Sequence, residues 1–279
     1  MSNPNITFIG AGNMAAALIG GLIADGTDPQ HITASDPDPD KLAALADSFG
    51  IRTTADNSQA VAAAEVVVLA VKPQVLQKVA EGLREAVQQH RPLLVSIAAG
   101  VRCATLDQWL GGGTALVRSM PNTPAMLQAG ATGLFATVRV SERQREQAEC
   151  ILRAVGLTRW VEDESLMDVV TAVSGSGPAY FFLVMEAMED AARQLGLDSE
   201  TARLLTLQTA LGAARMAIES SDDPATLRKK VTSPGGTTEQ ALLSLEKDGL
   251  RESFARALGA ARDRSVELSQ LLGESREKQ

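Results

Sequence analysis

"ITFIGAGNMAAALIGGL", residues 6–22, joins a short apolar run to a helical pattern through a glycine-rich turn. Gly10, Gly12 and Ala15 have the spacing G-x-G-x-x-[GA]. In such a segment the first small residue permits a tight turn, the second lets a pyrophosphate approach the backbone, and the third lets helix and strand pack closely. The helix begins near Asn13, where free N–H groups face the phosphates. The segment therefore predicts a βα turn that binds a dinucleotide.

Beyond this turn, strand-like runs alternate with helical patterns. The strand-like runs lie at 5–10, 31–36, 51–55, 65–71, 93–100, 115–120 and 132–138, and the helical patterns at 13–26, 41–50, 57–64, 74–89 and 103–110. Such alternation is typical of a parallel sheet with crossover helices. We therefore expect residues 1–163 to form a Rossmann-like, doubly wound α/β domain.

From about residue 164 the pattern changes to helix throughout. The stretch "PAYFFLVMEAMEDAARQLG" (178–196) is apolar around its whole circumference for two turns and then narrows to an apolar stripe. A helix that is apolar all round needs neighbours on every side, and so short a helical region can hardly supply them alone. We therefore expect residues 164–279 to form an all-α dimerisation domain that a partner subunit completes.

Composition narrows the class of protein. The chain has 279 residues, enough for two domains, and its 34 acidic against 26 basic residues leave a net charge of −8. Nucleic acid and anionic membranes are poor partners for such a surface.

Cys103 and Cys150 lie far apart and in no CxxC pair, so neither a disulfide framework nor a metal site is expected. With no basic leader and no apolar stretch long enough to cross a bilayer, a cytoplasmic location is expected.

The end of the second strand bears on the choice of cofactor. Asp36 stands where a carboxylate usually bonds the ribose hydroxyls of NAD and would repel a 2′-phosphate. Ser35 beside it, and Asn57 at the start of a later helix, can instead donate to a phosphate. The residues alone leave NAD(H) and NADP(H) both open.

The residues that are missing argue against an alcohol as substrate. An alcohol dehydrogenase must move a proton, usually with His or Lys. His31 and His90 lie in surface-like segments, and Lys72 in the fourth βα turn is better placed for cofactor than for substrate. A hydride acceptor that is already cationic, such as an iminium, needs no strong acid.

A second glycine-rich turn lies near the C-terminus, in "VTSPGGTTEQALLSLE" (231–246). Ser233 and the Pro-Gly-Gly that follows form a turn, and Thr237 and Thr238 open a helix, which together resemble an anion cradle. Thr237 and Gln240 also have the spacing of a capping box, so a plain capped helix explains part of the pattern.

Four stretches together resemble the pyrroline-5-carboxylate reductase family: "FIGAGNM" (8–14), "AVKPQ" (70–74), "MPNTPA" (120–125) with "SIAAGV" (96–101), and "AVSGSGPAYFF" (172–182) with "VTSPGGTTEQAL" (231–242). The resemblance runs from about residue 6 to about residue 270. It implies reduction of 1-pyrroline-5-carboxylate to L-proline with NAD(P)H, with NADP(H) preferred. It also implies interlocked homodimers, five of which often form a ring, with the substrate at the dimer interface.

The resemblance also implies the site residues. The cofactor contacts are Gly10, Ala11, Gly12, Asn13, Met14, Ser35, Asp36, Asn57, Ala70, Val71, Lys72, Pro73, Ala98, Ala99 and Gly100. The substrate contacts are Glu164, Ser233, Gly236, Thr237 and Thr238. Among them, the Thr238 hydroxyl is expected to accept a hydrogen bond from the substrate's protonated ring nitrogen, which makes it the catalytic candidate.

Two other hypotheses remain. A 3-hydroxyacid dehydrogenase has the same plan of a nucleotide domain followed by helices, but it places a catalytic Lys where this chain has "TAVSGSGPAYFF" (171–182). A non-enzymatic NAD(P)-sensing protein would keep the first glycine-rich turn but would have no reason for the second.

Overall fold

The computed structural model describes residues 4–274, so the outer ends of the two expected domains, at residues 1 and 279, lie outside the described residues. By packing, the chain divides into two compact units. The sheet unit comprises residues up to Ser176 together with residues from Ala260 onward, and the helical unit comprises Gly177–Gly259. The expected division at residue 164 follows the change from strands to helices, and it remains a proposal about functional domains.

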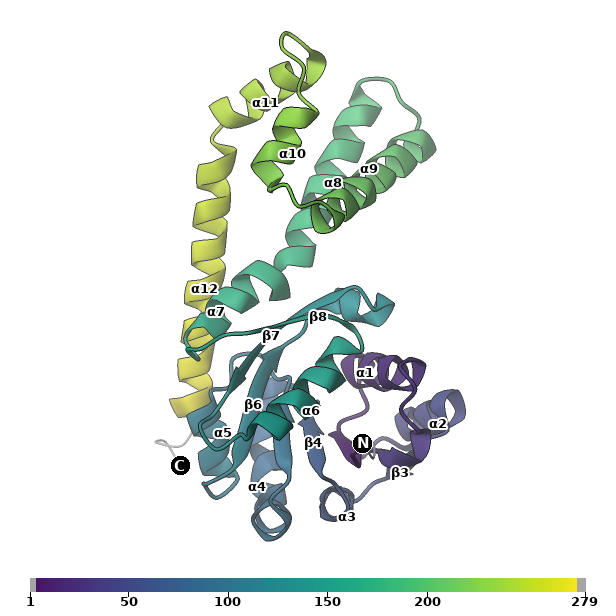
Figure 1. Cartoon of the computed structure of the whole chain (residues 1–279), viewed down its shortest axis with the longest axis vertical. Helices are drawn as coiled ribbons and strands as arrows, with labels where there is room; N and C mark the ends of the chain where they lie inside the picture. The colour runs from purple at the N-terminus through teal and green to yellow at the C-terminus, as the bar shows by residue number, and fades with distance from the viewer. Residues whose placement is uncertain (1–3, 275–279) are drawn as a thin grey trace. The chain divides into compact units, whose positions relative to one another are not determined.

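The sheet unit is built on one eight-stranded sheet (Figure 1). Its strands are β1 (Ile6–Ile9), β2 (Ile32–Ser35), β3 (Arg52–Thr54), β4 (Val66–Leu69), β5 (Leu93–Ser96), β6 (Ala115–Met120), β7 (Gly130–Ala136) and β8 (Gly156–Trp160). They lie in the order β3-β2-β1-β4-β5-β6-β7-β8. The strand order therefore reverses at β1 and β4, which is the switch point of a doubly wound sheet.

One pair departs from the predicted parallel arrangement. β6 and β7 are antiparallel, whereas every other neighbouring pair is parallel. The reason is the connection, because only the short 3₁₀ turn η2 (Thr123–Leu127) lies between them and a parallel pair needs a longer crossover. The strand β8 and the helix before it, α6 (Glu142–Arg153), were not among the predicted elements.

Helices cover both faces of the sheet. The helices are α1 (Asn13–Ala24), α2 (Pro39–Phe49), α3 (Asn57–Ala62), α4 (Pro73–His90) and α5 (Cys103–Trp109), with α6. Val66 and Val68 of β4 pack into the core beneath α1, α2 and α6, and Val67 and Leu69 into the core beneath α3, α4 and α5. Alternate residues of an extended strand point to opposite faces, so an all-apolar strand is what two covered faces require.

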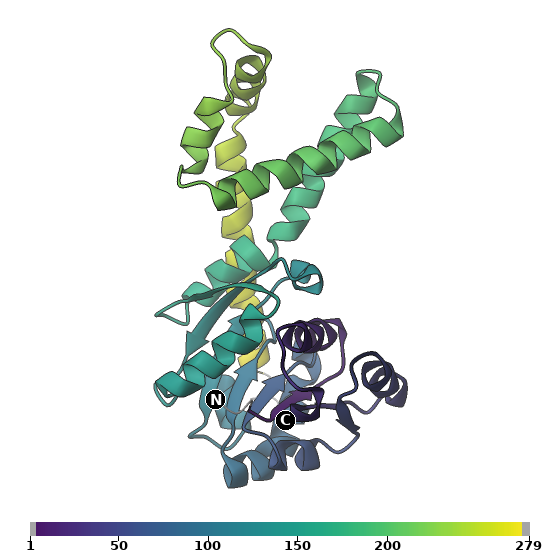
Figure 2. The same cartoon turned by 45° about the vertical axis from the view of Figure 1, so that its right-hand side comes forward.

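Past β8 the described chain contains no further strand, as expected. After the short helix α7 (Leu166–Val170) and the π-helical turn η3 (Thr171–Gly175) come α8 (Gly177–Gln194), α9 (Ser199–Glu219), α10 (Pro224–Lys230), α11 (Thr237–Lys247) and α12 (Leu250–Glu274). Within the helical unit α8 and α9 run side by side (Figures 1 and 2). The helix α12 begins in the helical unit and ends in the sheet unit.

The helical unit exposes an apolar surface. On α8 the exposed fractions of Phe181, Phe182 and Leu183 are 67%, 63% and 64%, and on α9 those of Leu204 and Leu205 are 60% and 58%. Large exposed patches of this kind mark surfaces that another molecule covers.

By length and composition, one helix within residues 4–274 is apolar enough to cross a membrane. It is Leu166–Gln194, 29 residues long, with only 22% of its most apolar window buried. The prediction that no apolar stretch reaches such a length was therefore wrong on this measure. The reason is that α7, the π-turn and α8 continue into one another, which the glycine-rich "SGSG" segment conceals in the sequence.

Candidate active site

The first glycine-rich turn has the geometry of a dinucleotide site. Gly10 has φ +105°, and a Cβ there would lie 2.7 Å from the carbonyl oxygen of Ala70, so only glycine fits. Around Gly12 the opposite holds, because a Cβ built there would meet no atom of the described chain within 4 Å. Gly12 is also the N-cap of α1 and offers no side chain to the helix start. The space in front of the N–H groups of Asn13 and Met14 is therefore open to an anion.

Asp36 closes this turn from the end of β2. Its carboxylate accepts hydrogen bonds from the N–H groups of Ala11 at 2.8 Å and Asp38 at 3.0 Å. Lys41 lies 3.8 Å away with its Nζ and is half exposed. Asp36 is predicted from the sequence to lie at the cofactor ribose, but its bond to the turn and the nearby cation were not predicted.

Ser35 and Asn57, the two candidate donors to a phosphate, are in direct contact. Ser35 is fully buried, and its hydroxyl donates to Oδ1 of Asn57 at 2.7 Å. The Asn57 amide group has no acceptor in the described chain, so its two N–H bonds are available to a ligand. Ser35 thus orients Asn57 rather than facing solvent itself.

The remaining cofactor candidates lie at the same edge of the sheet. Ala70, Val71, Lys72 and Pro73 follow β4 and lead into α4, while Ala98, Ala99 and Gly100 follow β5. The carboxyl ends of parallel strands beside a switch point are where such sheets bind ligands. All the cofactor residues predicted from the sequence therefore lie at or beside this edge of the sheet.

The second glycine-rich turn also forms a helix start. Gly236 donates its N–H to the carbonyl of Ser233 at 3.0 Å, and Gly235 has φ +71°. The N-cap of α11 is Gly236, without a side-chain cap, so the capping-box interpretation of Thr237 was wrong. The carboxylate that does bond the turn belongs to Glu239, which accepts from the Gly235 N–H at 2.7 Å.

This arrangement leaves donors free at the start of α11. The N–H groups of Thr237, Thr238 and Glu239 lie in the first helical turn, where no carbonyl four residues back is available. The Thr238 hydroxyl is exposed and makes no hydrogen bond within residues 4–274. The helical unit thus presents three N–H groups and one hydroxyl at a single point.

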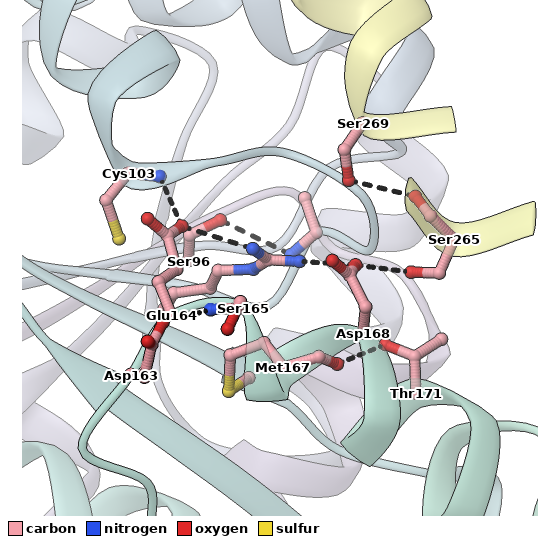
Figure 3. Close-up of polar contacts among 12 residues, drawn as sticks. Ser96, Cys103, Asp163, Glu164, Ser165, Met167, Asp168, Thr171, Ser265 and Ser269 are labelled. Atoms are coloured by element: carbon pink, nitrogen blue, oxygen red, sulfur yellow. Dashed lines mark hydrogen bonds and ion pairs between the residues drawn. The ribbon is translucent and has the colours of Figure 1, made fainter. Parts of the chain in front are cut away.

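Glu164 has partners within the sheet unit. Its carboxylate accepts from the N–H of Cys103 at 2.7 Å and from Nη1 of Arg118 at 3.1 Å (Figure 3). Burial, and then the charge of Glu164, raise the pKa of the Cys103 thiol, so the thiol stays protonated. The proposed substrate contact of Glu164 must therefore coexist with this ion pair.

Arg118 and Asp168 were not predicted as site residues from the sequence. Both are buried, with exposed fractions of 3% and 2%, and Arg118 Nη2 lies 3.7 Å from Asp168 Oδ1. Asp168 also accepts from the Ser265 hydroxyl at 2.7 Å (Figure 3). The available signal was the arginine inside the largely apolar strand "ALVRSM", because a buried cation requires partners.

The "MPNTPA" turn is tied to the π-helical segment. Asn122 donates from Nδ2 to the carbonyl of Ser174 at 3.0 Å and accepts from Ala131 N–H at 2.9 Å. A single π-turn often marks a functional site. Two of the four characteristic stretches are thus joined directly.

Known proteins match this chain over nearly its whole length. Residues 164–268 match the family described as pyrroline-5-carboxylate reductase dimerisation, and residues 5–100 match the family described as NADP oxidoreductase coenzyme F420-dependent. The pyrroline-5-carboxylate reductase of Pseudomonas aeruginosa is 54% identical, with 98% of this chain and 100% of the relative covered. The one from Vibrio alginolyticus is 46% identical, with 97% and 100% covered.

Solved structures of the same kind of enzyme also resemble this chain. A pyrroline-5-carboxylate reductase from Coxiella burnetii is 51% identical, with a TM-score of 0.93 over 96% of this chain and 99% of that one. The Plasmodium falciparum enzyme, solved with NADP bound, is 27% identical, with a TM-score of 0.83 over 96% and 99%. The dimerisation match includes α8, the helix whose apolar face is exposed.

Proposed function

Since the chain belongs to the pyrroline-5-carboxylate reductase family, it reduces 1-pyrroline-5-carboxylate to L-proline with NAD(P)H, and we propose that its two glycine-rich turns divide the binding between them. The first turn takes the cofactor pyrophosphate and the second takes the substrate carboxylate. The observation that carries this division is that each turn ends in a helix start with free N–H groups and no side-chain cap.

The residues of the first turn fit a dinucleotide, because the space over Gly12 is open and Gly10 is packed against Ala70. Bound NAD(P)H supplies the hydride. We propose that NADP(H) is preferred and that the Asn57 amide, oriented by Ser35, donates to the 2′-phosphate. Lys41 offsets the opposing charge of Asp36. The NADP bound to the Plasmodium falciparum relative supports this choice.

For the substrate, the N–H groups of Thr237, Thr238 and Glu239 hold the carboxylate, aided by the helix N-terminus. Ser233 and Gly236 shape the turn, since the Gly236 N–H already donates to Ser233. The Thr238 hydroxyl accepts from the protonated ring nitrogen and fixes the orientation of the reacting carbon, which is catalysis by positioning. Glu164 is also proposed to contact the substrate while it stays paired with Arg118.

The chain self-associates through its dimerisation domain. We propose that the dimer is interlocked, with the exposed faces of α8 and α9 covered by the partner, and that five dimers form a decamer in the cytoplasm. The exposed Phe181, Phe182 and Leu183 support extensive burial on association. Analytical ultracentrifugation separates a dimer from a decamer by mass.

The test of the function is an NAD(P)H oxidation assay with pyrroline-5-carboxylate and a panel of 3-hydroxy acids in the reverse direction. Turnover with the cyclic imine alone supports the proposal. Turnover of hydroxy acids would indicate a 3-hydroxyacid dehydrogenase, and cofactor binding without any turnover would indicate a sensor.

A further inference from the structure

The cofactor segment Ala98–Gly100 lies against the C-terminal end of α12. Gly100 has φ +75°, and a Cβ there would lie 3.7 Å from Leu268 Cβ and 3.6 Å from Leu272 Cδ1. Both sides of this contact belong to the sheet unit. Leu268 also falls within the segment matched to the dimerisation family, so part of that segment contacts the cofactor site directly.

A buried polar network holds α12 in this position. Ser265, one turn before Leu268, donates to Asp168 at 2.7 Å, and Asp168 faces Arg118 at 3.7 Å. Ser265, Asp168 and Arg118 are all at most 5% exposed. A hydroxyl bonded to a buried carboxylate is a strong hydrogen bond, because neither group has water as an alternative.

Residues of the same network lie next to both ends of the segment Ala98–Gly100. Arg118 on β6 stands in register with Ser96, the last residue of β5, from which the segment continues. At the other end α5 begins at Cys103, whose N–H donates to Glu164, and Glu164 is paired with Arg118. The residues between Ser96 and Cys103 are therefore bounded by one set of charges and flanked by α12.

The segment serves one half of the cofactor. β5 lies beyond β4 from β1, while Asp36 and Asn57 follow β2 and β3 on the other side of the switch point. A dinucleotide spans this point, one nucleotide to each side. Ala98–Gly100 therefore face the nicotinamide half, and Asn57 faces the adenosine half.

We propose that Ser265 is a positioning residue that acts through α12 to fix Ala98–Gly100 for the nicotinamide half of the cofactor. This inference rests on the proposed cofactor site. It assigns to the dimerisation segment a role in cofactor binding as well as in self-association.

The chain offers a matched control for this test. Ser269 is the same residue type one turn further along α12 and is equally buried, but its hydroxyl donates only to the carbonyl of Ser265 in its own helix. Ser265→Ala and Ser269→Ala therefore remove the same group, and only the first loses the bond to Asp168.

The experiment measures two affinities in the full-length protein. Fluorescence titration gives the Kd of NADPH, and calorimetry gives the Kd of adenosine 2′,5′-bisphosphate, which contains only the adenosine half. Ser265→Ala should weaken NADPH roughly three- to tenfold, as expected for partial loss of one charge-assisted hydrogen bond. The affinity for the adenosine fragment should not change, and Ser269→Ala should leave both affinities unchanged.

Other results overturn the inference. If Ser265→Ala lowers the melting temperature but not the NADPH affinity, the contact is only structural. If it weakens both ligands equally, the effect is not confined to Ala98–Gly100. If the wild-type protein binds neither ligand, the proposed cofactor site itself is wrong.

Discussion

Replacing Thr238 by alanine tests the substrate cradle most directly. The hydroxyl is exposed and unpaired in the described chain, so its removal should cost little stability. In the proposed complex it accepts a hydrogen bond from a cationic ring nitrogen, and such a bond contributes about 1.5–3 kcal/mol. This free energy corresponds to a drop in kcat/KM of roughly ten- to two-hundredfold.

The assay is steady-state oxidation of NADPH with pyrroline-5-carboxylate, together with the melting temperature and the Kd of NADPH. The melting temperature and the Kd of NADPH should stay at the wild-type values. Two variants serve as controls. Thr237→Ala keeps the backbone N–H that is proposed to bind and should remain fully active, and Thr238→Ser keeps the hydroxyl and should recover most of the loss.

Full activity of Thr238→Ala would refute the assignment of the ring-nitrogen contact. A large loss of NADPH affinity in the same variant would mean that the two glycine-rich turns have been assigned to the wrong ligands. Loss of activity in Thr237→Ala equal to that in Thr238→Ala would point to a disturbed helix start instead.

Three further predictions concern cofactor choice, assembly and acid stability. Asp36→Ser removes a negative charge beside the proposed site of the 2′-phosphate and should lower KM for NADPH several-fold while KM for NADH stays equal or rises; the opposite result in a two-cofactor assay would show that Asp36 binds the NAD ribose. Phe181→Glu should abolish self-association and activity together in sedimentation and turnover assays, whereas Val138→Glu, at a fully exposed site of the sheet unit, should change neither. Burial acts to raise the pKa of Asp107, but hydrogen bonds from Thr114 and the adjacent N–H outweigh it and hold the pKa below its usual value. The resulting stability is present above about pH 4 and is lost as pH falls through the folded-state pKa; the melting temperature of Asp107→Asn should therefore lie below that of wild type at pH 7 and converge with it in acid, and a constant difference would contradict this reasoning.

The fold was largely predictable because most of its strands are apolar and separated by clear helical patterns. β4 and β5 are buried throughout, so each appears as a short apolar run, which its length and its valines identify as a strand. β8 was missed because its five residues "GLTRW" are mixed in polarity and only partly buried. The antiparallel pairing of β7 with β6 follows from the short connection through η2, which the alternation of strands and helices alone does not reveal.

The candidate site was predictable where chemistry is local. Gly10 is required by backbone geometry and Gly12 leaves the space over the turn open, and both glycines are visible in their spacing. Asp168 and Ser265, by contrast, are 97 residues apart in the sequence, so their contact is a consequence of tertiary packing. The capping interpretation of Thr237 was wrong because glycine can cap a helix without any side chain.

The return of α12 to the sheet unit sets the order in which that unit can be completed during synthesis. Its final piece begins at Ala260, after the whole helical unit has been translated. At about 5–20 residues per second, the intervening helices delay this piece by roughly 4–17 s. Through that interval Asp168 has no Ser265 and Gly100 has no helix beside it. The nucleotide-binding unit therefore stays incomplete while the helical unit is translated. A stop codon that removes only α12 should leave a chain prone to aggregation and degradation.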